Sequence, residues 1–233
     1  MKIKGLQKLT LIDYPEKLAC TIFLFGCNFR CGFCHNPELV INDYLPEISQ
    51  EKIIDFLQRK KKYLDAVCFT GGEPLITLEE DFIRKVKSLG YLIKIDTNGS
   101  FPDKLREFIS KGLVDFVAMD VKSGREKYSH VCGTEVEILK IEESIKIISQ
   151  LPKYEFRTTI IYNFHDEQEV INIIGWIKGI THTKIKRFGL QGFKKEEKLL
   201  DETFNLENNV NEDFLLKLKE KIKEDCEEVI IRV

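Results

Sequence analysis

Three cysteines stand close together in the sequence, and their spacing is that of ligands for one metal centre. Cys27, Cys31 and Cys34 form a CxxxCxxC pattern in segment 26–37, which also contains two glycines and a proline. Cysteine thiolates are ligands of zinc and of iron–sulfur clusters, and this spacing lets one short loop wrap such a centre. We therefore predict that these three cysteines bind a metal centre and form the catalytic core of the protein.

The number of thiols favours an iron–sulfur cluster over zinc. An ordinary 4Fe-4S cluster has four cysteine ligands, and no fourth cysteine lies near the three in the sequence, so one iron would stay open to an external ligand. The alternative is a zinc site that takes His35 as its fourth ligand. Because Cys34 and His35 are adjacent, they fit that geometry awkwardly. Phe29 and Phe33 would keep water away from a cluster, or would pack the loop.

Two further segments with unusual residues follow predicted strands. Segment 69–74 reads FTGGEP, and two adjacent glycines either form a turn or let a ligand approach the backbone closely. Segment 96–99 reads DTNG, which offers hydrogen-bond acceptors, although Asn-Gly is also a usual turn. The candidate binding residues from these segments are Gly71, Gly72, Glu73, Asp96, Thr97 and Asn98.

Four charged or polar residues on later strands complete the candidate set. Asp120 and Lys122 are two positions apart at the end of a strand, so their side chains point to the same side and either share a ligand or form a surface ion pair. Arg157 lies inside an apolar strand and needs a carboxylate or a cofactor oxygen as partner, because arginine is rarely buried alone. Gln191 ends another strand, where a polar residue also serves as a plain terminus.

The elements that must position these residues alternate along the chain. Apolar runs predict seven strands, at residues 19–25, 66–69, 92–95, 116–119, 156–161, 185–190 and 229–233. Six helices are expected over 51–62, between Thr77 and Gly90, between Pro102 and Gly112, and over the apolar stripes at 141–148, 170–177 and 215–222. Thr77 and Glu80 have the spacing of a capping box, and Asn211 is the expected N-cap of the last helix.

This order of elements predicts an α/β fold built of repeated strand–helix units around a parallel sheet. Six such units closed by a last strand are fewer than the eight of a full barrel, so we expect a partial (β/α)6 barrel of the TIM type, open on one side. No repeat, linker or shift in composition marks a boundary, which favours one domain over residues 1–233. Chemistry is expected at the carboxyl ends of the strands.

Composition and charge exclude several classes of protein. The 36 basic and 38 acidic residues give a net charge of −2, so no basic field is available for nucleic acid or membrane lipid. The longest uncharged run near the N-terminus, 18–29, is too short to span a bilayer, and no export signal is evident. We expect a soluble cytoplasmic protein whose seven cysteines do not form a disulfide framework.

The remaining cysteines and histidines are not expected to form a second centre. Cys20 and Cys68 lie in predicted strands and should be buried as small apolar residues. Cys132 and Cys226 are isolated in the sequence, so no auxiliary cluster is expected. The histidines at 130, 165 and 182 are expected to be surface loop residues.

A CxxxCxxC loop with an aromatic residue before its last cysteine resembles the signature of radical S-adenosylmethionine (SAM) enzymes. Segment FTGGEP, in register behind it, is similar to the GGEP motif of that family. Over its whole length, from segment 13–15 (DYP) through 34–37 (CHNP) to 157–159 (RTT) and Gln191, the chain most resembles activating proteins of glycyl radical enzymes. The activating proteins of anaerobic ribonucleoside-triphosphate reductase, in their longer form, are the group that it resembles most.

The resemblance implies an oxidoreductase with two cofactors, a 4Fe-4S cluster and SAM. The cluster would have three cysteine ligands and one open iron that binds the amino and carboxylate groups of SAM. Reductive cleavage of SAM would give a 5′-deoxyadenosyl radical that takes hydrogen from a glycine Cα of a partner enzyme. A low-potential electron donor, such as flavodoxin or ferredoxin, would supply the electron.

The resemblance also assigns roles to the candidate residues. Gly71, Gly72 and Glu73 would bring backbone to the methionyl amino group, and the DTNG segment would supply acceptors for it. Asp120 and Lys122 would contact the ribose and the methionyl carboxylate, and Gln191 the adenosine part of SAM.

Two departures from the family pattern leave the partner open. Glu16 stands where glycine is expected after Tyr-Pro, and segment 162–164 (YNF) replaces a Pro-Gly turn after the fifth strand. The alternatives are therefore activation of another glycyl radical enzyme, such as pyruvate formate-lyase, radical chemistry on a small molecule, or a zinc-stabilised binding protein without catalysis.

Overall fold

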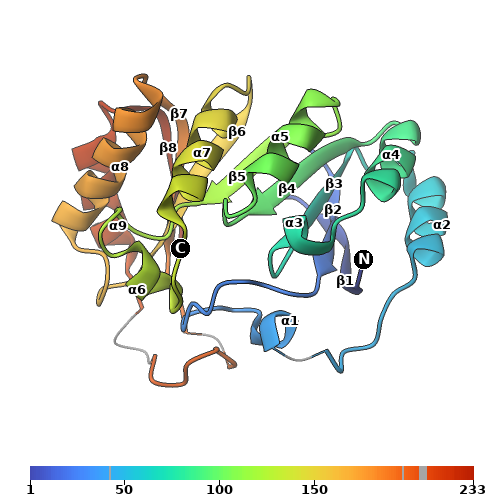
Figure 1. Ribbon diagram of the computed structural model, residues 1–233, viewed down its shortest axis with the longest axis horizontal. Helices are drawn as coiled ribbons and strands as arrows, with labels where there is room; N and C mark the ends of the chain where they lie inside the picture. Colours follow the sequence, from blue (N-terminus) through green and yellow to red (C-terminus); the bar gives the residue numbers. More distant parts are fainter. Residues whose placement is uncertain (42, 196, 205–208) are drawn as a thin grey trace. The chain divides into compact units, whose positions relative to one another are not determined.

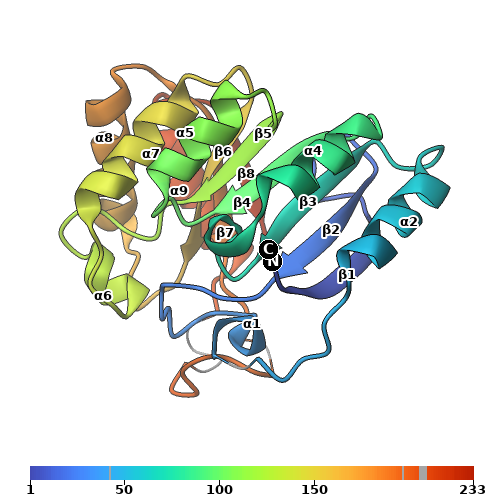
Figure 2. The same ribbon diagram turned by 45° about the vertical axis from the view of Figure 1, so that its right-hand side comes forward.

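The protein is an α/β protein with a mostly parallel, open sheet. A computed structural model describes residues 1–41, 43–195, 197–204 and 209–233 (Figure 1). Strands and helices alternate along most of these residues, as Figure 2 shows in a second view. The chain forms two compact units, which we call the N-terminal and the C-terminal unit. The N-terminal unit comprises Met1–Asn28, Asn36–Thr97 and Asp103–Val117, and the C-terminal unit comprises Phe29–His35, Asn98–Pro102 and Ala118–Val233.

The sheet of the N-terminal unit begins with an antiparallel pair and continues in parallel. β1 (Ile3–Thr10) runs antiparallel to β2 (Ala19–Leu24). β2, β3 (Ala66–Gly71) and β4 (Leu92–Thr97) are parallel neighbours in that order. β1 was not predicted, because this end strand buries only its two terminal residues and therefore lacks an apolar run.

Five helices accompany these strands. α1 (Pro37–Ile41) and α3 (Pro74–Thr77) are single turns that the sequence did not predict, and each begins at a proline that fits a first helical turn. α2 (Gln50–Lys60) and α4 (Glu80–Ser88) confirm predicted helices. So does α5 (Pro102–Ser110), which belongs to the N-terminal unit from its second residue onward.

The C-terminal unit repeats the parallel pattern. β5 (Phe116–Asp120) begins in the N-terminal unit and ends here. β6 (Tyr154–Ile160), β7 (Ile185–Gly192) and β8 (Cys226–Arg232) are parallel neighbours, and β8 is the last strand of the order. The helices are α6 (Tyr128–Cys132), α7 (Ile138–Ser149), α8 (Glu167–Thr181) and α9 (Glu212–Ile222), of which only the short α6 was not predicted.

The apolar runs that predicted the strands are buried, as strands covered on both faces require. In the N-terminal unit Ile22, Phe69 and Ile95 have no exposed surface, and Phe156, Phe188 and Leu190 have none in the C-terminal unit. α8 contacts both α7 and α9 in that unit. All seven predicted strands and all six predicted helices are confirmed; the single domain over residues 1–233 stays a prediction. No helix in the described ranges has the length and apolarity needed to cross a bilayer.

Two sequence-based expectations about local geometry have clear outcomes. The capping box was wrong, because Thr77 ends α3 and the N-cap of α4 is Glu79, which forms no side-chain cap. The hydroxyl of Thr77 is buried without a hydrogen-bond partner in the described residues. Glu16 has a φ of 62°, in the left-handed region that favours glycine, which gives a backbone reason for the glycine expected there.

The predicted cap of the last helix is confirmed and can be tested. The side chain of Asn211 accepts a hydrogen bond of 2.9 Å from the backbone N–H of Phe214 at the start of α9. Replacing Asn211 by Ala should lower the free energy of unfolding by about 1 kcal/mol, because that donor loses its partner. Asn211→Asp keeps an acceptor and should change stability by much less. Urea denaturation of the three proteins measures this, and equal stabilities of Ala and Asp variants would contradict the capping role.

Candidate functional site

The cysteine loop follows β2 and crosses from one unit to the other. Cys27 belongs to the N-terminal unit, whereas Cys31 and Cys34 belong to the C-terminal unit. Cys27 and Cys34 are partly exposed, and Cys31 is buried. None of the seven cysteines, all of which lie in the described residues, forms a disulfide. The three thiols therefore remain available as ligands.

The surroundings of Cys31 favour its thiolate. A hydrogen bond from the thiol of Cys132 lowers the pKa of Cys31 to about 7, against the opposing effect of burial. The positive charge of Lys122 acts in the same direction as the hydrogen bond. Metal ligands must be deprotonated, so a thiol with this pKa suits a ligand. The donor set of the loop thus fits an iron–sulfur cluster chemically.

Aromatic residues between the cysteines pack into the C-terminal unit. The ring of Phe33 lies 6.3 Å from that of Phe164 and 6.2 Å from that of Phe204, measured between centroids. Phe29 meets the ring of Tyr128 edge-on at 6.5 Å. Packing of the loop is therefore confirmed for both residues, and exclusion of water from a cluster stays a prediction. Phe164 comes from the segment that replaces the expected Pro-Gly turn, so this departure supplies a ring that contacts the cysteine loop.

The glycine pair at the end of β3, Gly71 and Gly72, lies against the backbone that leads to Cys27. Gly72 N–H donates to the carbonyl of Leu24 at 2.9 Å, and Glu73 N–H donates to that of Gly26 at 2.7 Å. A Cβ on Gly71 would lie 2.4 Å from the carbonyl oxygen of Leu24, and one on Gly72 would lie 2.1 Å from that of Gly26. Both glycines are thus required by backbone packing within the N-terminal unit. Approach of a ligand to the same backbone stays a prediction.

Glu73 and Asp96 are engaged in buried polar contacts of the N-terminal unit. Glu73 is fully buried, and its carboxylate accepts hydrogen bonds from Leu75 N–H at 3.0 Å and from Thr97 Oγ1 at 2.9 Å. Asp96 forms an ion pair with Lys94, which lies two positions earlier on β4 and is itself buried. Because side chains two apart share a face of a strand, Lys94 orients Asp96 on that face. No motif in the sequence pointed to Lys94 as a neighbour of the site.

Asn98 forms the turn that follows β4. Its Oδ1 accepts hydrogen bonds from the backbone N–H of Ser100 at 3.0 Å and from its hydroxyl at 2.5 Å. The next residue, Gly99, has a φ of 81°, and a Cβ there would lie 2.1 Å from Cε of Met119. The turn expected from Asn-Gly is therefore present. A role of Asn98 in ligand binding stays a prediction.

Asp120, Lys122 and Arg157 form a charged group in the C-terminal unit. Nε of Arg157 donates to Oδ1 of Asp120 at 2.7 Å, and Nζ of Lys122 lies 3.4 Å from Oδ2 of the same carboxylate. Arg157 therefore has the carboxylate partner that the sequence required. Asp120 and Lys122 do share one side, as predicted, and they form the ion pair that was the alternative interpretation. Binding of a ligand by these residues stays a prediction.

The charges in this group stabilise one another. Burial opposes ionisation of Asp120, but the cations of Arg157 and Lys122 outweigh it and lower the pKa of Asp120 well below its usual range. Burial likewise opposes the charged form of Lys122, and the carboxylate of Asp120 outweighs it and raises the pKa of Lys122. The group therefore holds one anion and two cations at neutral pH.

Two residues that the sequence analysis did not assign to the site fix the segment after Asp120. His165 is fully buried, so the expectation that it lies on the surface was wrong. The backbone N–H of Ile161 donates to Nδ1 of His165 at 3.2 Å. Nε2 of His165 lies 2.9 Å from the carbonyl oxygen of Lys122. Glu169 on α8 accepts hydrogen bonds from Ser123 Oγ and Gly124 N–H, each at 2.7 Å. In the sequence Glu169 is an ordinary acidic residue of a first helical turn, so no local signal predicted its hydrogen bonds with Ser123 and Gly124.

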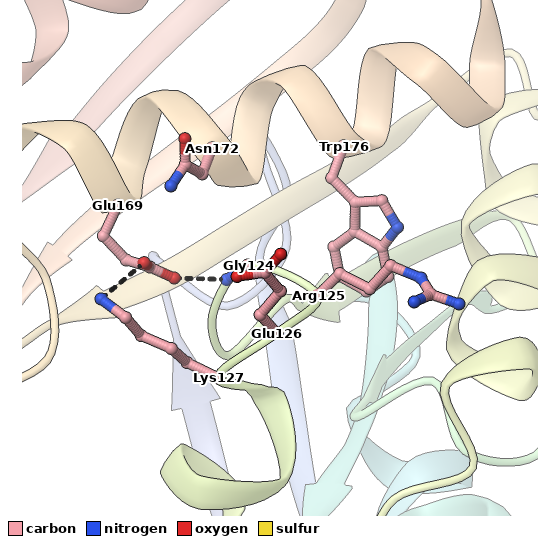
Figure 3. Close-up of a pocket in the computed structure, with 7 residues that line it drawn as sticks. All are labelled: Gly124, Arg125, Glu126, Lys127, Glu169, Asn172 and Trp176. Atoms are coloured by element: carbon pink, nitrogen blue, oxygen red, sulfur yellow. Dashed lines mark hydrogen bonds and ion pairs between the residues drawn. The ribbon is translucent and has the colours of Figure 1, made fainter.

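A cavity of about 290 Å³ lies beside this segment and is separate from the candidate residues. Figure 3 shows Glu169 on α8 facing Gly124 and Lys127. Nζ of Lys127 lies 3.0 Å from the carboxylate of Glu169. Arg125 pairs with Glu142 at 3.0 Å. The charged groups here stabilise the segment, and none of the predicted site residues lines the cavity. Its lining comprises Gly124, Arg125, Glu126, Lys127, Glu169, Asn172 and Trp176.

The other candidates have less defined surroundings. Gln191 lies next to the last residue of β7, beside Thr159 of β6 and Arg232 of β8 in the strand register, so its place at a strand end is confirmed. His35 is exposed, and its ring lies 5.5 Å from that of Phe193. In the described residues no three histidine, cysteine or acidic side chains could hold a single metal ion. Cysteines of a 4Fe-4S cluster bind different irons, so such a cluster does not require that convergence.

Burial of His165 makes stability depend on pH. Desolvation lowers the pKa of His165 below its ordinary value of 6.5, so the unfolded chain binds this proton more readily than the folded one. Its contribution to stability is complete above pH 6.5 and is lost as the pH falls through the folded-state pKa. We expect the free energy of unfolding to fall less steeply from pH 7 to 5 in His165→Gln than in the original protein. The exposed His182, replaced by Asn, is the control, and parallel curves for the original protein and His165→Gln would contradict the assignment.

The charged group around Asp120 predicts an asymmetric loss of stability. Asp120→Asn leaves two neighbouring cations without their anion and should lower the free energy of unfolding by about 2 kcal/mol, given partial exposure. Asp103, which pairs with Arg106 on the surface and is 91% exposed, is the matched control. Asp103→Asn should change stability by less than about 0.5 kcal/mol. Denaturant unfolding measures both, and equal losses would show that the charged group is not a stabilising centre.

Comparison with known proteins identifies the family. The profile of the radical SAM superfamily matches residues 21–177. A Methanocaldococcus jannaschii protein named for glycyl-radical enzyme activation, MJ1227, is 33% identical over 99% of this chain and 95% of its own. The pyruvate formate-lyase-activating enzyme of Clostridium pasteurianum is 28% identical over 85% of this chain and 86% of its own.

Solved structures agree with this fold. The structure of TYW1 with a lysine-pyruvate adduct has a TM-score of 0.66 and 14% identity, covering 89% of this chain and 74% of that chain. The structure of native anSMEcpe with bound AdoMet has a TM-score of 0.63 and 18% identity, covering 90% of this chain and 62% of that chain. At these identities the likeness concerns the fold alone. The sequence matches decide the family: the chain belongs to the radical SAM superfamily and, within it, to the enzymes that activate glycyl radical enzymes.

Proposed function

We propose that this chain uses SAM to generate a glycyl radical on a partner enzyme. The observation that supports the proposal most is the CxxxCxxC loop, with no disulfide among its thiols, in a chain that aligns over nearly its whole length with a relative named for this activity. The family implies a 4Fe-4S cluster and SAM. When bound, the cluster would supply the electron for reductive cleavage of SAM, the chemistry needed to remove hydrogen from a glycine Cα of the partner.

The residues of the loop have distinct tasks in this proposal. Cys27, Cys31 and Cys34 would hold the cluster, and as three ligands they would leave one iron open to SAM. Cys31 is buried and presents a thiolate near neutral pH, whereas Cys27 and Cys34 are partly exposed, where a cluster and its nucleotide need room. Phe29 and Phe33 keep solvent from the ligands by their packing.

The strand ends would bind SAM. The segments after β3 and β4 would hold the methionyl amino group through backbone and acceptor groups: Gly71, Gly72, Glu73, Asp96, Thr97 and Asn98. Asp120, ionised at all physiological pH values, is an acceptor for ribose hydroxyls, and Lys122 is a donor for the methionyl carboxylate. Arg157 holds Asp120 in place. Gln191 at the end of β7 is proposed to contact the adenosine part.

The partner is proposed to be a glycyl radical enzyme of the pyruvate formate-lyase type or an anaerobic ribonucleoside-triphosphate reductase. The relatives reported above are named for glycyl radical enzymes in general and for pyruvate formate-lyase, which favours the first. The overall motif pattern of the sequence resembles the second group. The electron donor is proposed to be a low-potential protein such as flavodoxin or ferredoxin, and the site of action the cytoplasm.

Reconstitution tests the cofactor chemistry directly. After anaerobic reconstitution with iron and sulfide, the protein should bind about four irons per chain and release 5′-deoxyadenosine from SAM when reduced with dithionite. Cys31→Ala should lower that release more than 100-fold, because one iron loses its ligand. Cys226→Ala, which removes another buried thiol of the same unit, should retain it. A colourless protein that binds zinc through the loop would instead establish the non-catalytic alternative.

Partner choice needs a separate measurement. The reconstituted protein should produce the glycyl radical doublet in electron paramagnetic resonance spectra when mixed with its partner, SAM and reductant. Pyruvate formate-lyase and anaerobic ribonucleoside-triphosphate reductase from one source are offered in parallel. A signal with one of them identifies the partner class, and SAM cleavage with neither signal would favour a small-molecule substrate.

A further inference from the structure

The cysteine loop is held by α6, a helix that the sequence did not predict. The backbone N–H of Arg30 donates to the carbonyl of Cys132, the last residue of α6, at 2.8 Å. The preceding residue Phe29 meets Tyr128, the first residue of α6, edge-on. Two neighbouring residues of the loop thus contact the two ends of one short helix. All these residues belong to the C-terminal unit.

The end of α6 fits the loop without room for a larger backbone. Gly133 follows Cys132 with a φ of 64°, and a Cβ at this position would lie 2.3 Å from the carbonyl oxygen of Arg30. The glycine therefore serves both the left-handed end of the helix and the close approach of the loop. Because the backbone is fixed on both sides of Cys132, the place of its side chain relative to the loop is fixed as well.

The thiol of Cys132 reaches the sulfur of Cys31. Cys132 is fully buried, Cys31 is 8% exposed, and the two side chains are hydrogen-bonded. Nothing in the sequence brings them together, since they are 101 positions apart. A thiolate that binds iron has no proton to give, so Cys132 must be the donor of this hydrogen bond when Cys31 is a ligand.

We propose that Cys132 is a positioning residue of the cluster, which donates its S–H to the sulfur of Cys31 and thereby raises the reduction potential of the bound cluster. The inference rests on the proposed function, because it requires Cys31 to be a ligand. Reduction adds negative charge that is shared with the cysteine sulfurs, and a hydrogen-bond donor stabilises that added charge. The electron is thus accepted from a less strongly reducing donor.

The size of the effect follows from the weakness of a thiol donor. We expect the equilibrium constant for one-electron reduction to fall about threefold without the S–H, which corresponds to a shift of about 30 mV to more negative potential. A serine hydroxyl donates at least as well as a thiol. Cys132→Ser should therefore keep the potential at or above that of the original protein.

The experiment compares three variants at Cys132 with one control. Cys132→Ala and Cys132→Val remove the donor, the first by shortening the side chain and the second with a slightly larger apolar one, and Cys132→Ser keeps a donor. Cys226→Ala removes a buried thiol elsewhere in the same unit. Each reconstituted protein is titrated with dithionite, and electron paramagnetic resonance gives its midpoint potential. Iron and sulfide contents are measured alongside.

The expected result is full iron content in every protein, a lower potential in the Ala and Val variants, and an unchanged potential in Cys226→Ala. A potential in the Ala and Val variants equal to that of the original protein would overturn the proposal while leaving the cluster intact. Loss of iron from both variants, with normal loading of the control, would show that Cys132 is itself needed as a ligand and would also overturn it. Absence of a cluster from the original protein would instead overturn the proposed function.

A second measurement detects the hydrogen bond in the original protein itself, so its main result does not require a variant to fold. In D₂O, the reduced cluster should show hyperfine coupling to an exchangeable deuteron from the S–D group. Cys132→Ser should retain that coupling and Cys132→Val should lose it. A coupling that persists in Cys132→Val would come from another donor and would contradict the proposal.

Discussion

The carboxylate of Asp120 is the constraint on which the C-terminal unit depends. It balances the guanidinium of Arg157 and the ammonium of Lys122, so that three charges lie together with a net charge of +1. Without this anion the two partly exposed cations would cost about 2 kcal/mol, because their desolvation would go uncompensated. Lys122, two positions after Asp120, is held where its ammonium reaches the carboxylate.

From that point the segment to Gly133 is fixed by a series of contacts. His165 holds the carbonyl of Lys122, Glu169 holds the N–H of Gly124, and the carbonyl of Cys132 accepts from the cysteine loop. Each contact satisfies a polar group that burial would otherwise leave costly. Within the C-terminal unit, Asp120 and Lys122 are therefore linked to the cysteine loop by hydrogen bonds of the connecting segment.

The N-terminal unit positions its part of the site by close backbone packing. The turn after β3 contacts the backbone of Leu24 and Gly26, which leads directly to Cys27. Any side chain larger than hydrogen at Gly71 or Gly72 would move that backbone. The glycine pair, to which the family resemblance assigns a role in binding SAM, therefore also fixes the backbone at the start of the cysteine loop.

Local signals predicted much of this protein, and non-local pairing accounts for what they missed. The apolar runs gave the parallel strands because both faces of those strands are buried, and Asn211 was recognised because a cap depends on residues three apart. The capping box predicted from Thr77 was wrong because Thr77 ends a separate helical turn, which begins at Pro74 and is capped by Glu73. The spacing of Thr77 and Glu80 does not reveal that turn. The contact of His165 with Lys122 and that of Cys132 with Cys31 depend on how distant segments pack, and no short window of sequence contains both partners.

The ionisation of the charged group decides how it could take part in binding. Since two cations keep the pKa of Asp120 far below neutrality, its carboxylate accepts hydrogen bonds and never donates one at physiological pH. Hydroxyl groups of a ligand can donate hydrogen bonds to this carboxylate. A carboxylate of a ligand would be repelled by Asp120 unless it paired with the ammonium of Lys122. A nucleotide that carries both a ribose diol and a carboxylate satisfies the anion and one cation of the group at once, whereas a neutral ligand without hydroxyls would satisfy neither. Under the proposed function, charges that already stabilise the fold would therefore also match the ribose diol and the carboxylate of SAM.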